Sequence, residues 1–420
     1  MEVRDFRLWW LSVLLMWVSL QMLEVSIGWE VYAQHGSALD LGWIGLAEFV
    51  PMFVLALPAG QLADRVPRRV VFAGALLIGV GVGVGLALLS ASGNTSLAPY
   101  LALAAGAGTS MALGTPAARA LPPTLVPPEL VQSAMTLRSI ASQTGQVLGP
   151  ALGGLLYGVS PSLVYLLAGG ACLAAAGFVV AMRPAAAADA AVSADDEGVG
   201  GEREEADLHS VLEGLRFVRH TQILLGAILL DLLAVLFGGA VALLPIFARS
   251  ILHVGATGLG LLRAAPAVGA LLAAAFVTHR PIAGRAGRLL LTVVFLYGAS
   301  MIVFGLSRSF PLSLLALGVS GFVDLYSMNI RSTTVALATP DRLRGRVNAV
   351  EMVFISASNQ LGYFESGVAA ALVGAVPAVV GGGIMTMLIA LSWGRLFPAL
   401  AQVDRLETLS PTSPRLEAHA

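Results

Sequence analysis

The chain has 420 residues, of which 57% are hydrophobic and only 12% are charged, and its formal net charge is −1. A soluble domain is about 45 to 50% apolar even when glycine is counted, so this composition excludes a soluble globular protein and indicates a chain that crosses a membrane several times. The near-zero net charge also argues against a nucleic-acid partner.

The basic residues are all arginine, and the only cysteine is Cys172. A phosphate-binding G-x-x-x-x-G-K-[ST] loop and a lysine Schiff base both need lysine, so ATP-driven pumping is disfavoured. A single cysteine excludes an internal disulfide and a cysteine-rich zinc site, and the six histidines show no metal-ligand spacing. No nucleophile, base and orienting group recur at a recognisable spacing. We therefore expect no metal, no cofactor and no enzyme activity.

Apolar runs of about 20 residues, long enough to span a membrane, recur along the chain. The first follows Arg4 and Arg7 and is too long for the apolar core of a signal peptide. Six runs precede a polar segment and six follow it, at residues 8–32, 40–62, 70–92, 98–119, 134–157, 161–183, 222–248, 257–278, 287–307, 311–337, 346–371 and 375–397. The expected fold class is an all-α polytopic membrane protein with 12 transmembrane helices in two six-helix bundles.

Residues 184–221 separate the two sets of helices. The part at 184–207 combines low hydrophobicity with many acids, which is typical of a disordered linker. The part at 209–220 carries its apolar residues on one helical face and predicts a short amphipathic helix. We therefore expect bundles at 1–183 and 222–397, a cytoplasmic linker at 184–221 and a disordered cytoplasmic tail at 398–420. Arginines concentrate on the side of both termini, which the positive-inside rule places in the cytoplasm.

A dense cluster of charge lies between the second and third predicted helices, in the segment GQLADRVPRR at 60–69. Such charges are too costly for hydrocarbon and indicate a cytoplasmic loop. The segment resembles the G-x-L-A-D-R-x-G-R-R loop of the major facilitator superfamily of secondary transporters, although Pro67 stands where glycine is usual. The resemblance implies a conformational latch formed by Gly60, Asp64, Arg65, Arg68 and Arg69. The alternative is a charge cluster that only sets orientation.

A glycine-rich element lies on the fifth predicted helix. It consists of Gly145, Gly149, Pro150, Gly153 and Gly154; the spacing bares the backbone for close packing, and the proline bends the helix. It resembles the G-x-x-x-G-P-x-x-G-G element of antiporting exporters in the same superfamily. Together with similar loops before residues 134 and 346, it makes residues 6–397 resemble the exporter branch that contains the enterobactin exporter and the macrolide efflux proteins. Ordinary helix packing is the alternative.

Ionisable side chains inside membrane helices are costly and are candidates for proton or substrate handling. The candidates are Glu24, Glu48, Asp231, Asp324, Arg331 and Glu351, with Arg138, Arg263 and Glu365 completing the set. Helices 1, 4, 7 and 10 line the central cavity in the superfamily that the chain resembles, which favours Glu24, Asp231 and Asp324.

Structural ion pairs are the alternative for each of these residues. Arg331 lies about two turns from Asp324 on the same helical face, so Asp324 or Glu351 is its expected partner in that case. Glu30, near the extracellular end of the first helix, is expected to be a solvated interface charge.

These features predict a secondary active transporter: a proton-coupled antiporter that exports an amphipathic small molecule, such as a drug or siderophore, by alternating access. The expected partners are the substrate, protons and the lipid bilayer, with the chain acting as a monomer in the bacterial plasma membrane. Two alternatives stay open: a proton-coupled importer of the same fold, and a membrane protein that has lost transport and acts as a sensor or assembly partner.

Overall fold

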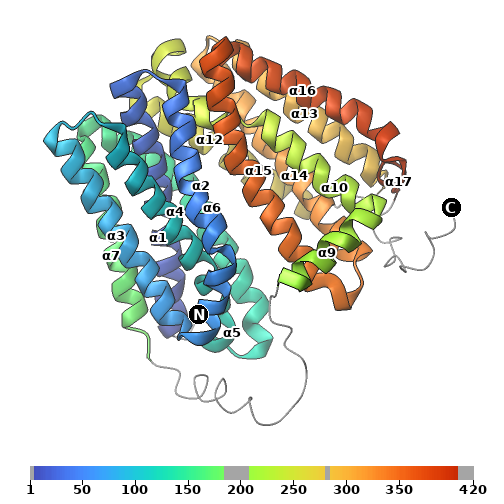
Figure 1. Cartoon of the computed structure of the whole chain (residues 1–420), viewed down its shortest axis with the longest axis horizontal. Helices are drawn as coiled ribbons and strands as arrows, with labels where there is room; N and C mark the ends of the chain where they lie inside the picture. Colours follow the sequence, from blue (N-terminus) through green and yellow to red (C-terminus); the bar gives the residue numbers. More distant parts are fainter. Residues whose placement is uncertain (1–3, 184–207, 280–283, 405–420) are drawn as a thin grey trace. The chain divides into compact units, whose positions relative to one another are not determined.

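Figure 1 shows the computed structural model of the chain, which describes residues 4–183, 208–279 and 284–404. Every regular element within these ranges is a helix. The chain divides into two compact units. Unit 1 comprises Met1–Arg203 and His253–Ala264, and unit 2 comprises Glu204–Leu252 and Ala265–Ala420.

Unit 1 contains six long helices and two short connecting ones. The long helices are α1 (Arg4–His35), α2 (Ala38–Arg65), α3 (Arg68–Ser92), α4 (Leu97–Ala120), α6 (Val131–Val159) and α7 (Pro161–Val180); the short ones are α5 (Pro122–Leu125) and the 3-10 helix η1 (Pro128–Leu130). The largest side chains that are fully buried in unit 1 are Trp9, Phe72, Tyr100 and Tyr165. The six predicted runs before the linker therefore correspond to six helices.

The glycines of α6 determine how closely α1 lies against it. A β-carbon on Gly145 would come within 2.4 Å of the Trp17 β-carbon, and one on Gly149 within 2.5 Å of the Gln21 β-carbon. A β-carbon on Gly153 would lie 3.1 Å from the backbone of Met22. Real β-carbons do not approach neighbouring atoms this closely in the first two cases, so α1 can occupy its position only because these residues are glycine.

Unit 2 contains the remaining helices. They are α9 (Leu208–His220), α10 (Gln222–Gly238), η2 (Ala240–Leu243), α11 (Leu244–Ile246), the π-helical turn η3 (Phe247–Ile251), α13 (Ala286–Leu306), α14 (Phe310–Ala338), η4 (Asp341–Leu343), α15 (Arg344–Val373), α16 (Ala375–Leu396) and α17 (Pro398–Ala401). Helix α12 (Gly255–His279) belongs to unit 1 up to Ala264 and to unit 2 from Ala265. The run predicted at 222–248 lies within one candidate membrane span, Gln222–Ile251, but the helix is not continuous. Helix α10 ends at Gly238, and Gly239 has ψ 81°, which is not helical.

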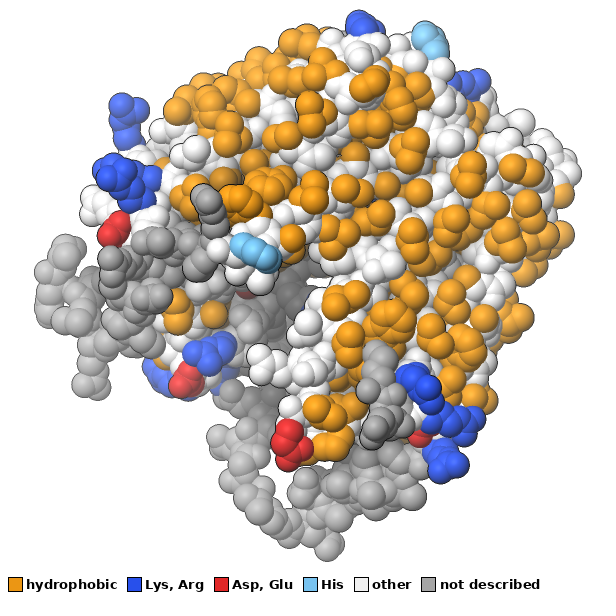
Figure 2. Space-filling view, turned by 180° about the vertical axis from the view of Figure 1, so that it is seen from behind, with side chains coloured by type: hydrophobic (Ala, Val, Ile, Leu, Met, Phe, Trp, Pro, Cys, Tyr) orange, Lys and Arg blue, Asp and Glu red, His pale blue; other side chains and the backbone are white. Residues whose placement is uncertain are grey.

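Ten of the helices in the described residues are long and apolar enough to cross a membrane. Helices α6 and α15 are also long, with 29 and 30 residues, but they carry more polar side chains. Helix α15, for example, includes Arg346, Glu351 and Glu365. Figure 2 shows a face of the molecule on which hydrophobic side chains predominate and charged ones gather toward the borders. Exposed apolar side chains of this extent fit contact with lipid.

The linker region agrees with the sequence-based expectation where it is described, whereas the residues after α16 differ from it. Helix α9 coincides with the amphipathic helix expected at 209–220, whereas the expected linker at 184–207 lies outside the described residues. Disorder was expected from residue 398, but α17 and the residues up to 404 are ordered: Leu400 is 1% exposed. The carbonyls of Val403 and Asp404 accept hydrogen bonds from the backbone N–H groups of Gly287 and Ala286. The rest of the expected tail, 405–420, is not described.

Helix α9 packs against the start of α15. Arg346 forms an ion pair with Glu213, and a β-carbon on Gly214 would lie 2.8 Å from the carbonyl oxygen of Arg346. We expect Gly214→Leu to push α9 away from α15 and to loosen the helix, so that limited trypsin digestion cuts after Arg216 and Arg219, which are exposed in the wild type as well, several times faster. Gly345→Leu is the matched control, since a β-carbon on Gly345 meets nothing within 4 Å. Equal cleavage of the two variants would contradict this docking.

Candidate functional site

The first group of charges lies in unit 1 and joins three helices. Arg263 of α12 donates a hydrogen bond to Glu24 Oε1 of α1 and forms an ion pair with it. The Arg263 side chain is 12% exposed and that of Glu24 is 26% exposed. Glu48 of α2 interacts electrostatically with both. The structure therefore brings together two predicted acids, Glu24 and Glu48, around one arginine.

Small residues allow α12 to reach this position. A β-carbon on Gly154 of α6 would lie 2.4 Å from the carbonyl oxygen of Ala256, and one on Gly260 would lie 2.4 Å from the carbonyl oxygen of Pro150. The backbones of α6 and of the first half of α12 are thus in direct contact. This contact explains why His253–Ala264 belongs to unit 1, although the sequence led us to place all of 222–397 in the second bundle.

The second group of charges lies in unit 2. Arg331 of α14 forms an ion pair with Asp231 of α10, and their side chains are 9% and 11% exposed. A small cavity is lined by both residues and by Tyr297, Asp324 and Ser327. Asp324 is largely exposed, and Glu351 of α15 interacts electrostatically with Arg331 and Asp231. Arg331 therefore pairs with Asp231, rather than with Asp324 or Glu351 as the structural alternative assumed.

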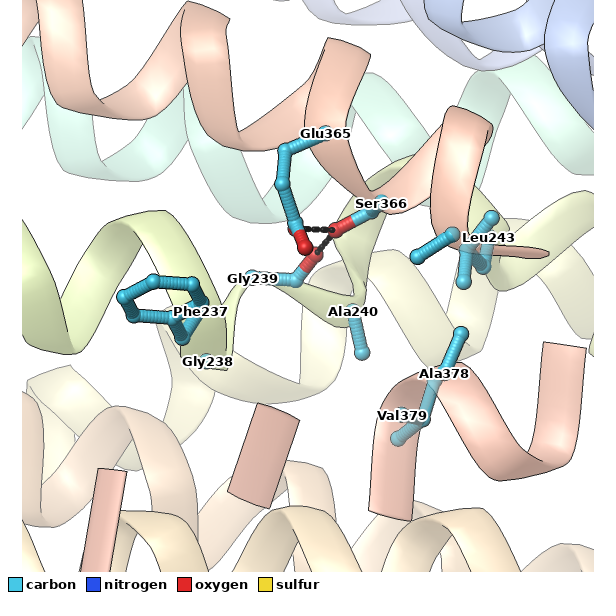
Figure 3. A pocket seen from close by; sticks show the side chains of 10 residues that line it. Phe237, Gly238, Gly239, Ala240, Leu243, Glu365, Ser366, Ala378 and Val379 are labelled. Atoms are coloured by element: carbon cyan, nitrogen blue, oxygen red, sulfur yellow. Dashed lines mark hydrogen bonds between the residues drawn. The ribbon is translucent and has the colours of Figure 1, made fainter. Parts of the chain in front are cut away.

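A further small cavity lies beside the end of α10 (Figure 3). The Ser366 hydroxyl of α15 points toward the carbonyl oxygen of Gly239, at 2.9 Å, and toward Glu365 Oε2, at 3.5 Å. The carbonyls at a helix end have no partner within the helix, so Ser366 satisfies one that the break after Gly238 leaves open. The cavity holds one predicted carboxylate, Glu365, but no basic residue.

The predicted latch segment is more helical than expected. Helix α2 continues to Arg65, so only Val66 and Pro67 separate it from α3. Arg68 donates to the carbonyl oxygen of Ala120 at 3.0 Å, and Arg69 donates to that of Met182. Both arginines thus bind carbonyls at or just after the ends of α4 and α7, where a positive charge is favourable. Gly60 and the side chains of Asp64 and Arg65 are not described.

Glu30 differs from its prediction as a solvated interface charge. Its side chain is buried, with 4% of the residue exposed, and its carboxylate accepts hydrogen bonds from Tyr100 and Tyr165. No feature of the local sequence indicates this burial, because the two tyrosines lie 70 and 135 residues further along the chain. Position near a helix end was therefore a poor guide to exposure.

Known proteins resemble this chain along most of its length. The chain is 29% identical over 361 residues to the multidrug efflux pump Tap of Mycolicibacterium fortuitum, covering 82% of this chain and 83% of Tap. It is 27% identical over 350 residues to the enterobactin exporter EntS of Citrobacter koseri, covering 82% of this chain and 80% of EntS.

Solved structures show the same fold. A POT family transporter in complex with 5-aminolevulinic acid superposes with a TM-score of 0.71 at 12% identity, covering 95% of this chain and 97% of that one. A bacterial homolog of the human lysosomal transporter Spinster gives a TM-score of 0.68 at 16% identity, covering 96% of this chain and 98% of that one. Likeness at this identity concerns the fold alone.

The family model of the Major Facilitator Superfamily matches residues 9–363. The match confirms the predicted all-α membrane fold, and the predicted count of 12 membrane helices is consistent with this family. It also confirms that the protein is a membrane transporter of small molecules and not an enzyme. Because the matched region covers most of the 420 residues, the chain belongs to the Major Facilitator Superfamily.

Proposed function

We propose that this transporter is a proton-coupled exporter, which moves an amphipathic small molecule out of the bacterial cell across the plasma membrane in exchange for protons. Both curated relatives reported above are exporters by name, one of drugs and one of the siderophore enterobactin. Their identities of 29% and 27% support the direction of transport and leave the substrate open between these two classes.

The observation that carries the proposal is the pairing of carboxylates with arginines inside membrane helices, Glu24 with Arg263 and Asp231 with Arg331. A buried ion pair stays together only while the acid is ionised, and removal of one charge makes the remaining charge costly. Protonation of either acid would therefore release its arginine. Three species therefore compete for each carboxylate: a proton, the paired arginine, and a positively charged group of the substrate.

The Glu24 pair has a direct structural route to a conformational change. It ties α1 to the first half of α12, the segment that packs against Gly154 and Pro150 of α6. If the ion pair breaks, only the close packing between the glycines of α6 and α12 holds that segment in place, with no electrostatic attraction between the helices. In the proposed cycle, protonation of Glu24 frees α12 to move against α1 and α6, and the charged segment at 60–69 acts as the latch.

Purified protein in liposomes tests the function. We expect an imposed pH gradient to drive uptake or release of a fluorescent cationic dye or a catechol siderophore, and a protonophore to abolish this flux. The absence of pH-gradient-dependent flux for substrates of both classes would reject proton-coupled export.

Asp324→Asn tests the role of the cavity in unit 2. Asp324 shares that cavity with the Asp231–Arg331 pair but is not itself paired with the arginine. We expect the variant to keep its fold and to lose at least tenfold of the proton-driven flux, since an amide cannot take up a proton at neutral pH. Asp341→Asn, at a largely exposed position in η4, is the matched control and should transport normally. Equal flux in the two variants would remove Asp324 from the proton pathway.

A further inference from the structure

A second buried carboxylate in unit 1 is separate from the Glu24 pair. Glu30 Oε1 accepts a hydrogen bond from the Tyr100 hydroxyl of α4 at 2.9 Å, and Oε2 accepts one from the Tyr165 hydroxyl of α7 at 2.6 Å. Glu30 is 4% exposed, and both tyrosines are 0% exposed. Glu24 lies six residues earlier on α1, which turns it to a different face of the helix.

The described groups that bind Glu30 are polar but uncharged. None of its ion-pair or hydrogen-bond partners among the described residues is an arginine or a histidine. The nearby titratable groups are Tyr157 of α6, which interacts with Tyr165, and His35, whose ring pairs with Asp40 of α2. A buried carboxylate without a cation depends entirely on its hydrogen-bond donors.

Gln34 connects this buried group to the surface. Its side-chain amide nitrogen donates to Glu30 Oε1 at 3.3 Å and to the Tyr100 hydroxyl oxygen at 3.1 Å. Gln34 lies one helical turn after Glu30 on α1 and is exposed. A hydrogen-bonded path thus runs from the exposed end of α1 to the buried carboxylate.

The amide of Gln34 can serve both protonation states of Glu30. With its NH₂ group toward the carboxylate, as in the structure, the ionised acid has three donors: Tyr100, Tyr165 and Gln34. Rotation of the amide by half a turn would present its carbonyl oxygen, which can accept the proton of a neutral Glu30 and the Tyr100 hydroxyl. Tyr165 continues to donate to Oε2 in both states. Neither state leaves a buried polar group without a partner.

We propose that Glu30, Gln34, Tyr100 and Tyr165 form a proton-binding site of unit 1, at which Glu30 gains and loses a proton and the Gln34 amide turns to match its protonation state. The site is distinct from the Glu24–Arg263 pair and holds a proton without requiring an ion pair to break. The role of the bound proton in transport rests on the proposed function. Proton binding at Glu30 does not, because it can be measured without substrate or transport.

Infrared difference spectroscopy between alkaline and acidic buffers tests the site on the full chain in lipid nanodiscs. We expect a band of a protonated, buried carboxyl that disappears in Glu30→Gln and persists in Glu129→Gln, whose parent residue is exposed. If all of the buried carboxyl signal survives in a folded Glu30→Gln protein, the proposal is overturned.

Tyr165→Phe provides a test that does not depend on folding of the Glu30 variant. It removes the donor to Oε2, and a hydrogen bond to a charged acceptor is stronger than one to a neutral acceptor, so the ionised form loses more. We expect the titration midpoint of the Glu30 band to move about 1 to 2 pH units higher. Tyr157→Phe, which alters a tyrosine that interacts with Tyr165 and keeps the Tyr165 hydroxyl in place, should move it much less. An unchanged midpoint in Tyr165→Phe would overturn the site, whether or not the protein transports protons.

Discussion

Replacement of Arg331 by glutamine is expected to destabilise the protein by about 3 to 5 kcal/mol, because it leaves the Asp231 side chain buried without its partner. Loss of one member of a buried pair costs more than the pair itself contributes, since the charge that remains keeps its full desolvation cost. Thermal unfolding of the purified protein in detergent, followed by intrinsic fluorescence, gives the change in the unfolding temperature.

Arg344→Gln is the matched control for this variant. Arg344 pairs with Asp341 in the same unit, but the two side chains are 50% and 88% exposed. An exposed pair contributes about 0 to 1 kcal/mol, so the control should unfold within a few degrees of the wild type. Similar unfolding temperatures for both variants would show that the Asp231–Arg331 pair is far more hydrated than its burial indicates.

The double variant Asp231→Asn/Arg331→Gln separates stability from transport. Removal of both charges leaves two neutral amides that can bond to each other, so most of the lost stability should return. Transport should not return, because the proposed proton exchange at Asp231 needs a carboxylate. A double variant that is stable and fully active would leave the pair a purely structural role.

Replacement of Gly149 by leucine is expected to reduce transport more than tenfold and to lower the unfolding temperature. Even a β-carbon at this position would come within 2.5 Å of the Gln21 β-carbon and 2.8 Å of the Val18 carbonyl oxygen. A leucine side chain therefore forces α1 and α6 apart and displaces Glu24, which lies one turn beyond Gln21 on α1.

Gly170→Leu is the control for the glycine variant. Gly170 is also in a membrane helix of unit 1, α7, but a β-carbon there meets nothing within 4 Å. Both substitutions remove a helical glycine, so any difference between them reports the contact with α1 and not helix propensity. Wild-type flux in Gly149→Leu would mean that the close approach of α1 and α6 has no part in transport.

The sequence was sufficient to predict the positions of most helices, because each needs about 20 apolar residues and few other segments have them. It was less informative where an apolar run contains a backbone break. The run from 222 to 248 is apolar except for Gln222 and Asp231, but Gly238 and Gly239 end α10 in the middle of it. Hydropathy averages over the window and cannot register a change of one backbone angle.

The candidate site could be predicted as a set of charged residues but not as a set of pairs. Arg331 and Asp324 share a helical face, which favoured their pairing, while the actual partner Asp231 lies 100 residues away on α10. Arg263 pairs with Glu24, 239 residues earlier. Such contacts depend on how the helices pack, and helical periodicity describes only one helix at a time.

The ordered residues after α16 have a consequence for the order of folding. Helix α13 begins at Ala286, and its first backbone N–H groups have no partner within the helix. Ala286 and Gly287 donate instead to the carbonyls of Asp404 and Val403, while Leu400 is buried in the core of unit 2. During synthesis the start of α13 therefore lacks these two acceptors until more than a hundred further residues have been translated.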